Sequence, residues 1–253
     1  MNPSRARFQT TSASFLRRGG RGRGARQEAV AFTLIEMLTV IAVIGLLAAL
    51  AAGLSSFSST KSRQNRIKAE LHLLTTALES YQADFGHYPP DHLVPQPSSV
   101  LVDAVTNQLF YELTGVIVTY NEDNNTGQFY TAGRTETITT GTVKDFFGTD
   151  GFVNAQTDTN KPPRAYFQPK SSQYAEISGP PLAGPVVEVL VVPVKWPLNR
   201  ADQPTGRKGV NPWRYVSTRP TNNVSSFDLW AEWVERKEVK ILSNWNPDPQ
   251  DKK

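Results

Sequence analysis

The chain contains two apolar patterns that follow each other directly. Between Met37 and Thr60 there is no charged residue, and within 37–54 only Thr39 is neither apolar nor glycine. A helix needs about 20 mostly apolar residues to cross the hydrocarbon core of a bilayer. We therefore predict a transmembrane and assembly helix over 32–57.

The second pattern predicts an amphipathic continuation of the same helix over 58–86. Apolar residues recur there at spacings of four and three, which place one stripe on a helix face: Ile67, Leu71, Leu74, Leu78 and Tyr81. Polar residues between them predict a solvated opposite face: Lys61, Arg63, Gln64, Lys68, Glu70 and Glu79. No proline lies between positions 4 and 88, so one helix can run from Phe32 to Phe85 and stop at Gly86.

The remaining residues, 87–253, predict a globular head built from short strands. Of 18 prolines, 11 lie between 162 and 220, which excludes a regular helical domain there. The expected fold class is α+β, with a long N-terminal helix packed on a small antiparallel β-rich head. Its expected elements are a short second helix within 98–113, strands at Val116–Tyr120 and Val186–Val192, and a hairpin or long loop over Asn121–Thr142.

The head must be held together by apolar packing alone, because the chain has no cysteine and hence no disulfide. About 165 residues suffice for such a core. We expect the five tryptophans to form part of it: Trp196, Trp213, Trp230, Trp233 and Trp245.

Positive charge is concentrated at the N-terminus. Lysine and arginine number 27 and aspartate and glutamate 23, but seven arginines and one glutamate fall within the basic leader, 1–31. From Phe32 onward the chain has 20 basic and 22 acidic side chains, a net charge of −2. We therefore predict no nucleic-acid partner, although an alternative interpretation takes the arginine–glycine run at 18–24 as an RNA-binding fragment. The leader also predicts a cytoplasmic N-terminus, since it outweighs the few cations after the span.

The most specific motif surrounds Glu36. The segment Ala31–Leu38 reads Ala-Phe-Thr-Leu-Ile-Glu-Met-Leu, which resembles the class III signal of type IV prepilins and type II secretion pseudopilins. The resemblance implies cleavage between Ala31 and Phe32, N-methylation of Phe32, and pairing of Glu36 with the Phe32 amine of a neighbouring subunit. Most of the family has glycine where this chain has Ala31, so slower processing is expected at worst.

The same resemblance implies a structural filament subunit. Its partners would be copies of itself, other pseudopilins, the prepilin peptidase, the inner-membrane assembly platform and the membrane. The subunit would start as a single-pass bacterial inner-membrane protein with a periplasmic head and then enter a pilus or pseudopilus. Tyr81–Pro90, and the Pro-Trp, Asp-Leu and Asn-Trp elements between Asn211 and Trp245, also resemble the major pseudopilins.

No metal and no cofactor are predicted. In the major pseudopilins, a loop after the Asp-Leu element binds calcium, but here Asp228-Leu229 leads into Ala231–Glu238, with no Asp-Gly and two cations. Calcium takes about six to eight oxygen ligands, and the carboxylates present do not make such a set. His87 and His92 flank Asp91, and we expect these histidines to be surface turn residues rather than metal ligands.

Catalytic motifs do not support an enzyme. The chain has no cysteine nucleophile, G-x-S-x-G elbow, phosphate loop or H-E-x-x-H pair. The alternative function is a membrane-anchored or secreted periplasmic protein, glycan-binding or hydrolytic, that uses the N-terminal segment only as an anchor or signal. In one form of that alternative, Ala49-Leu50-Ala51 is a secretory cleavage site and the product starts at Ala52.

Overall fold

The computed structural model describes residues 32–95, 100–121, 126–131, 137–178 and 186–252. The side chains of 51–58 and of residues 95, 100 and 121 lie outside this description. The chain divides into two compact units, 1–52 and 53–253. The leader, 1–31, belongs to the residues that are not described, and with it Ala31.

Helix α1 (Leu34–Phe85) supplies the apolar stripe that the sequence predicts. Its five stripe residues are all buried, which confirms the spacing argument: Ile67, Leu71, Leu74, Leu78 and Tyr81. The helix stops at Gly86, as expected. This residue has a φ of +77°, and its N–H donates to the carbonyl of Gln82 at 2.8 Å. Glycine reaches this left-handed conformation without a steric cost.

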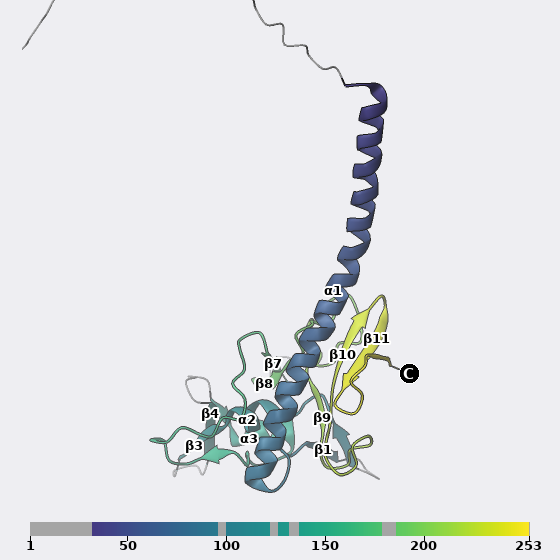
Figure 1. Cartoon of the computed structure of the whole chain (residues 1–253). Coiled ribbons are helices and arrows are strands. Elements are labelled where there is room, and N and C mark those ends of the chain that lie inside the picture. Colours follow the sequence, from purple (N-terminus) through teal and green to yellow (C-terminus); the bar gives the residue numbers. More distant parts are fainter. Residues whose placement is uncertain (1–31, 96–99, 122–125, 132–136, 179–185, 253) are drawn as a thin grey trace, which may run out of the picture. The chain divides into compact units, whose positions relative to one another are not determined.

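The second unit combines helices and sheets, which confirms the α+β class (Figure 1). One four-stranded sheet has the order β5 (Ile138–Thr139), β4 (Thr126–Thr131), β3 (Val116–Asn121), β6 (Ala155–Gln156). The other has the order β12 (Gln250–Asp251), β11 (Glu238–Ser243), β10 (Asp228–Glu235), β9 (Arg214–Val216). Two hairpins pair β1 (His92–Pro95) with β2 (Val100–Asp103), and β7 (Tyr174–Ser178) with β8 (Val186–Leu190). Among the described strands, only β3 and β6 pair in parallel.

Several expected elements have shifted bounds. Helix α2 covers only Leu109–Thr114, because Val100–Asp103 forms strand β2 instead of helix. The stretch expected as a hairpin or long loop, Asn121–Thr142, is partly a hairpin, because β3 and β4 pair antiparallel. Helix α3 (Thr140–Phe147) begins within the last three residues of that stretch. Strand β8 ends at Leu190, two residues earlier than predicted.

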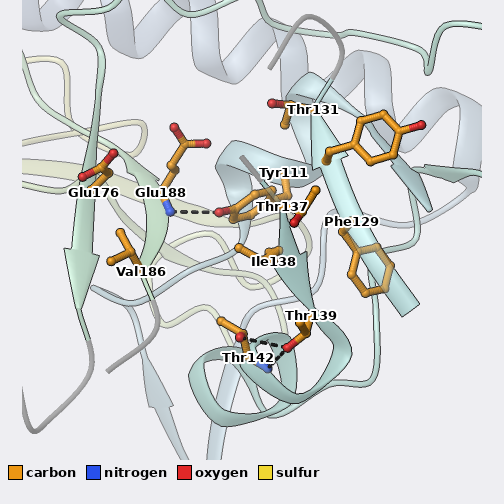
Figure 2. A pocket seen from close by; sticks show the side chains of 11 residues that line it. Tyr111, Phe129, Thr131, Thr137, Ile138, Thr139, Thr142, Glu176, Val186 and Glu188 are labelled. Atoms are coloured by element: carbon orange, nitrogen blue, oxygen red, sulfur yellow. Dashed lines mark hydrogen bonds between the residues drawn. The ribbon is translucent and has the colours of Figure 1, made fainter. Parts of the chain in front are cut away.

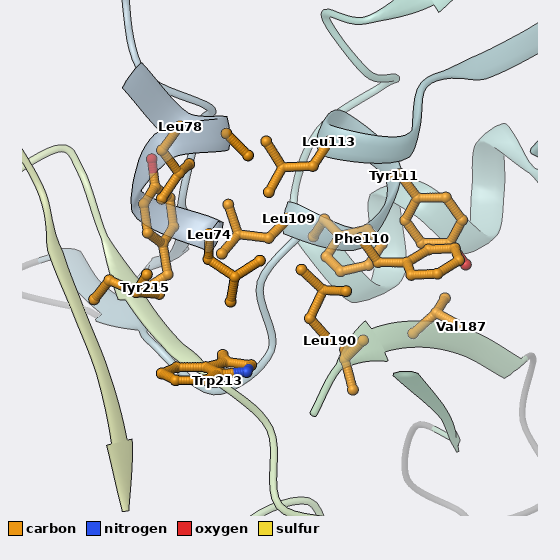
Figure 3. Packing of buried hydrophobic residues seen from close by; sticks show 14 of the residues in the cluster. Leu74, Leu78, Leu109, Phe110, Tyr111, Leu113, Val187, Leu190, Trp213 and Tyr215 are labelled. Carbon is orange, nitrogen blue, oxygen red and sulfur yellow. The ribbon is translucent and has the colours of Figure 1, made fainter. Parts of the chain in front are cut away.

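The core lies around the C-terminal part of α1 (Figure 3). Leu74 and Leu78 face α2 residues Leu109 and Leu113, while Trp213 packs from the β9 side. Three of the five tryptophans are buried, as predicted: Trp196, Trp213 and Trp233. The prediction is wrong for the other two, Trp230 and Trp245, which are half-buried and contact each other with ring centroids 5.8 Å apart.

Glu70 corrects the prediction of a solvated helix face. Only 7% of its surface is exposed. Its carboxylate accepts hydrogen bonds from Trp213 Nε1 at 2.9 Å and Gln173 Nε2 at 3.0 Å. Burial raises the pKa of Glu70, although both hydrogen bonds act in the opposite direction. The sequence signal was present: position 70 follows Ile67 by three residues and precedes Leu74 by four, so it lies on the apolar stripe.

Glu112 of α2 is the second buried carboxylate that ties α1 to the head. It is fully buried. It accepts hydrogen bonds from the Tyr81 hydroxyl at 2.8 Å, from the N–H of Val153 at 2.8 Å and from the N–H of Asn154 at 2.9 Å. Burial raises the pKa of Glu112 despite these three donors. One carboxylate therefore joins three segments of the second unit.

Candidate functional site

The predicted assembly residue, Glu36, lies in the first turn of α1 and closes the start of the helix. Glu36 Oε2 accepts hydrogen bonds from the Thr33 N–H at 2.8 Å and from Thr33 Oγ1 at 2.7 Å. In return, Thr33 Oγ1 lies 3.3 Å from the Glu36 N–H, which donates to it. This reciprocal arrangement is a capping box, in which a threonine and a glutamate three residues later satisfy helix-end donors.

The capping box uses one side of the carboxylate. Both Thr33 donors reach Oε2, and no hydrogen bond between described residues uses Oε1 of Glu36. The next hydroxyl along the helix, Thr39 Oγ1, donates to the Glu36 backbone carbonyl at 2.9 Å. This hydroxyl is therefore hydrogen-bonded within the helix and does not reach the Glu36 carboxylate. Glu36 is exposed, so Oε1 is sterically able to accept a further hydrogen bond.

Around and beyond Glu36, the helix is apolar on every side. Twelve large apolar side chains between Phe32 and Leu50 are each 47–83% exposed: Phe32, Leu34, Ile35, Met37, Leu38, Val40, Ile41, Val43, Ile44, Leu46, Leu47 and Leu50. At 3.6 residues per turn, the positions of those within the helix fall on all of its sides, so they do not form a single stripe. A helix that is hydrophobic all round is stable when other apolar material surrounds it. Among the described residues, no helix meets the length and apolarity required of a membrane span.

The processing residues are only half described. Ala31 lies outside the described residues, whereas Phe32 is described and 68% exposed. Phe32 immediately precedes the capping threonine. A cut before Phe32 would therefore place a new ammonium group at the residue next to the capping box.

His87, Asp91 and His92 do not converge on a common point. Asp91 is buried, and its carboxylate accepts hydrogen bonds from the backbone N–H groups of Ser217 and Thr218 at 2.9 and 2.8 Å. The prediction of turn residues is wrong for His92, which lies in β1 with Nδ1 3.7 Å from Asp103 Oδ2. In the described parts of the chain, no group of three or more histidine, aspartate and glutamate side chains could hold a metal ion.

The segment Ala231–Glu238, which takes the place of the calcium loop of the major pseudopilins in the sequence comparison, belongs to a β-hairpin. Strands β10 and β11 flank a tight turn at Arg236 and Lys237, both with positive φ. The Asp228 carboxylate binds the backbone N–H groups of residues 221, 222 and 223 at 2.8–2.9 Å. Glu232 lies 3.4 Å from Arg214 and 2.9 Å from Lys252. These carboxylates therefore hold the hairpin and its neighbouring loop in place.

A pocket of about 420 Å³ with both polar and apolar lining residues lies between β4, β5 and the β7–β8 hairpin (Figure 2). Four threonines line it, together with Tyr111, Glu176 and Glu188: Thr131, Thr137, Thr139 and Thr142. The Tyr111 hydroxyl accepts a hydrogen bond from the Glu188 N–H at 2.9 Å, and Glu176 lies 3.7 Å from Arg207. Hydroxyl and carboxylate groups suit a polar ligand such as a sugar.

The residues that the sequence singled out therefore separate into two groups. Phe32 and Glu36 lie just before and within the first turn of α1, while the carboxylates of Asp91 and Asp228 accept hydrogen bonds from backbone N–H groups of the head. The capping role of Glu36 was missed, although the Thr-x-x-Glu spacing is its ordinary signal. No family model, curated protein or solved structure matches this chain.

Proposed function

We propose that the chain is a non-enzymatic structural subunit of a type II secretion pseudopilus or a related type IV pilus-like filament. The observation that carries the proposal is the start of α1. There, an acidic residue with one carboxylate oxygen unused by described residues lies in a helical surface that is otherwise apolar and exposed. We further propose that 32–57 lies in the bacterial inner membrane before assembly, with the head in the periplasm.

In the proposed assembly, prepilin peptidase cuts between Ala31 and Phe32 and the new amino group is methylated. The resulting ammonium is a cation at the end of an apolar helix. Glu36 Oε2 is already engaged by Thr33, so the ammonium of a neighbouring subunit would bind at Oε1. Each subunit would then supply one cation and one carboxylate, which favours an open, head-to-tail filament over a closed pair.

The energetics favour charge pairing as the driving force. Transfer of an apolar helix from lipid to a helix bundle gains little from the hydrophobic effect, because lipid tails are as apolar as leucine. An unpaired carboxylate at the centre of a bilayer costs about 2.5–3.5 kcal/mol on insertion scales. Two unit charges 4 Å apart attract by about 4 kcal/mol at an effective dielectric constant of about 20. Pairing therefore offsets the cost of carrying Glu36 into the apolar layer.

The head would be displayed outside that layer. Within the second unit, the stripe of α1 and the carboxylates of Glu70 and Glu112 hold the helix to the rest of the head. This attachment allows a subunit interaction made through 32–57 to position the head on the filament surface.

Three variants separate charge pairing from helix capping. We expect Glu36→Ala to be inserted and cleaved normally but to reduce filament yield by more than about tenfold, the equivalent of 1.4 kcal/mol. Glu36→Gln keeps a capping acceptor without the charge and should also fail to assemble. Thr33→Ala removes the capping hydroxyl but keeps the carboxylate, and should assemble. Yield would be measured as sheared filaments per amount of cleaved subunit.

Equal defects in Thr33→Ala and Glu36→Ala would mean that Glu36 acts only as a helix cap. Normal filaments from Glu36→Gln would contradict charge pairing. Either result would remove the main support for the proposed filament interface.

A membrane-anchored or secreted glycan-binding protein is the second candidate. The threonine-rich pocket of Figure 2 favours it, because neutral sugars are bound through hydroxyl and carboxylate groups. Under this alternative, Glu36→Gln would leave the function intact, whereas Thr131→Val with Thr142→Val would abolish binding of oligosaccharides to the full chain. Loss of filaments in Glu36→Gln without any glycan binding would exclude it.

A further inference from the structure

The head contains a second and larger pocket, of about 750 Å³, whose rim is basic. Four cationic side chains line it, contributed by α1, by the segment after β8 and by the turn before β9: Arg66, Lys195, Arg207 and Lys208. Its floor is largely apolar and includes Val192, Trp196 and Val210. None of the described lining residues is acidic.

Most of this positive charge is not neutralised locally. Arg207 lies 3.7 Å from Glu176. No ion pair between described residues includes Arg66, Lys195 or Lys208, and all three are exposed. From Phe32 onward the chain has a net charge of −2, so the cluster is a local feature rather than part of a generally basic surface. Like charges gathered around a concave apolar floor focus the potential inside it.

We infer that this pocket binds a short acidic peptide segment of a partner protein. The basic rim matches carboxylates, and the apolar floor matches the side chains between them. The volume falls within the range of about 300–1,000 Å³ that is usual for ligand sites. A nucleic acid fits less well, because Trp196 is only 4% exposed and offers no open ring face for a base. The overall acidity of the chain after Phe32 would also repel a long polyanion.

Trp196 helps to keep the pocket rigid. Two guanidinium groups contact its ring, with Arg200 5.8 Å and Arg214 5.7 Å from the ring centroid. Arg200 is paired with Asp202 at 2.7 Å, and Arg214 with Glu232 at 3.4 Å. These paired cations support the floor, while Arg66, Lys195 and Lys208, which form no ion pair with a described residue, stay available for the ligand. A preorganised site loses less entropy on binding.

The site lies wholly within residues 66–211 of the second unit and does not depend on cleavage or filament assembly. It therefore goes beyond the proposed function, and either proposal can fail without the other. In a filament subunit, such a pocket would let the head recruit a partner through an exposed acidic segment.

The test is fluorescence anisotropy with the full chain in detergent and a fluorescein-labelled peptide of alternating glutamate and alanine. The matched neutral peptide replaces glutamate with glutamine. The variant Lys195→Gln with Lys208→Gln removes two rim charges, both on exposed residues. The control variant, Lys144→Gln with Lys161→Gln, removes the same charge from exposed residues that do not line the pocket. All proteins retain the leader, so any binding by its arginines is common to them.

We expect the rim variant to weaken binding of the glutamate peptide by about tenfold or more. The control variant should change it by less than about twofold, and the glutamine peptide should not bind. Equal affinities of the two variants, or of the two peptides, would overturn the proposal. Full displacement of the peptide by inorganic phosphate at constant ionic strength would assign the pocket to small free anions and would overturn it as well.

Discussion

Residues 34–50 and residues 59–85 belong to the same helix, yet their apolar side chains have opposite environments. In the first region, every large apolar side chain is exposed. In the second, the stripe residues are buried, and only polar groups and a few apolar side chains such as Leu73 face outward. The second region therefore has packing partners within its own unit, whereas the described residues supply none that bury the first.

The carboxylates of the two regions show the same difference. Glu70 receives its donors from Trp213 and Gln173 of the head. Glu36 receives donors only from the adjacent Thr33 among the described residues. Both lie on largely apolar helix surfaces. Folding of the second unit thus supplies distant donors to Glu70, whereas the donors to Glu36 among the described residues come from the adjacent turn alone.

The largest expected effect on folding is that of Glu112→Ala. The substitution leaves three buried donors without an acceptor: the Tyr81 hydroxyl and the N–H groups of Val153 and Asn154. An unsatisfied buried donor costs about 1–3 kcal/mol, so we expect a loss of about 4–6 kcal/mol in the free energy of unfolding. Urea denaturation of the full chain in detergent, followed by tryptophan fluorescence, measures it. A loss below about 1 kcal/mol would show that the segments do not depend on this carboxylate.

Adjacent leucines test the burial pattern directly. Leu74→Ala opens a cavity in the core and should cost about 3 kcal/mol. Leu73→Ala, at a side chain that is 54% exposed, should change the free energy of unfolding by less than about 0.5 kcal/mol. The same denaturation experiment measures both variants. Equal effects would contradict the proposed difference between the two faces of the helix.

A smaller effect is expected from the pH dependence of Glu70→Gln. Burial raises the pKa of Glu70 above its ordinary value of 4.5. Between the unfolded and the native pKa, the native state binds more protons than the unfolded state, so the contribution of Glu70 to stability falls as pH rises. Glu70→Gln has no titrating group at this position, so its stability does not include this pH-dependent loss. Its stability relative to the unsubstituted chain should therefore improve as pH increases from below 4.5 toward neutrality.

Unfolding of both proteins across this pH range checks the prediction. The comparison cancels the titration of the other carboxylates, which are common to the two chains. A stability difference that stays constant with pH would contradict the raised pKa. A difference that moves against the variant with increasing pH would show a lowered one.

Local patterns of the sequence were sufficient for the elements of α1. The stripe from Ile67 to Tyr81 follows from spacing alone, and the helix stop follows from the conformational freedom of Gly86. The capping box of Thr33 and Glu36 is equally local and could have been predicted. These features involve residues within one or two helical turns of each other.

The parts that could not be predicted depend on contacts between distant residues. The Glu70 donors are 103 and 143 residues away along the chain. The parallel pairing of β3 with β6 and the pocket rim formed by Arg66 and Lys208 likewise require the folded head. Spacing places Glu70 on the apolar stripe, but no spacing rule identifies its distant donors or brings the residues of the basic pocket together.

We propose that processing exposes an amino group at Phe32, which pairs with Glu36 of a neighbouring subunit. The most direct measurement is the mass and sequence of the mature N-terminus of the protein taken from native membranes. We expect a chain that begins at Phe32 and carries a methyl group on its amine. A chain beginning at Ala52, or one that retains the leader 1–31, would contradict it.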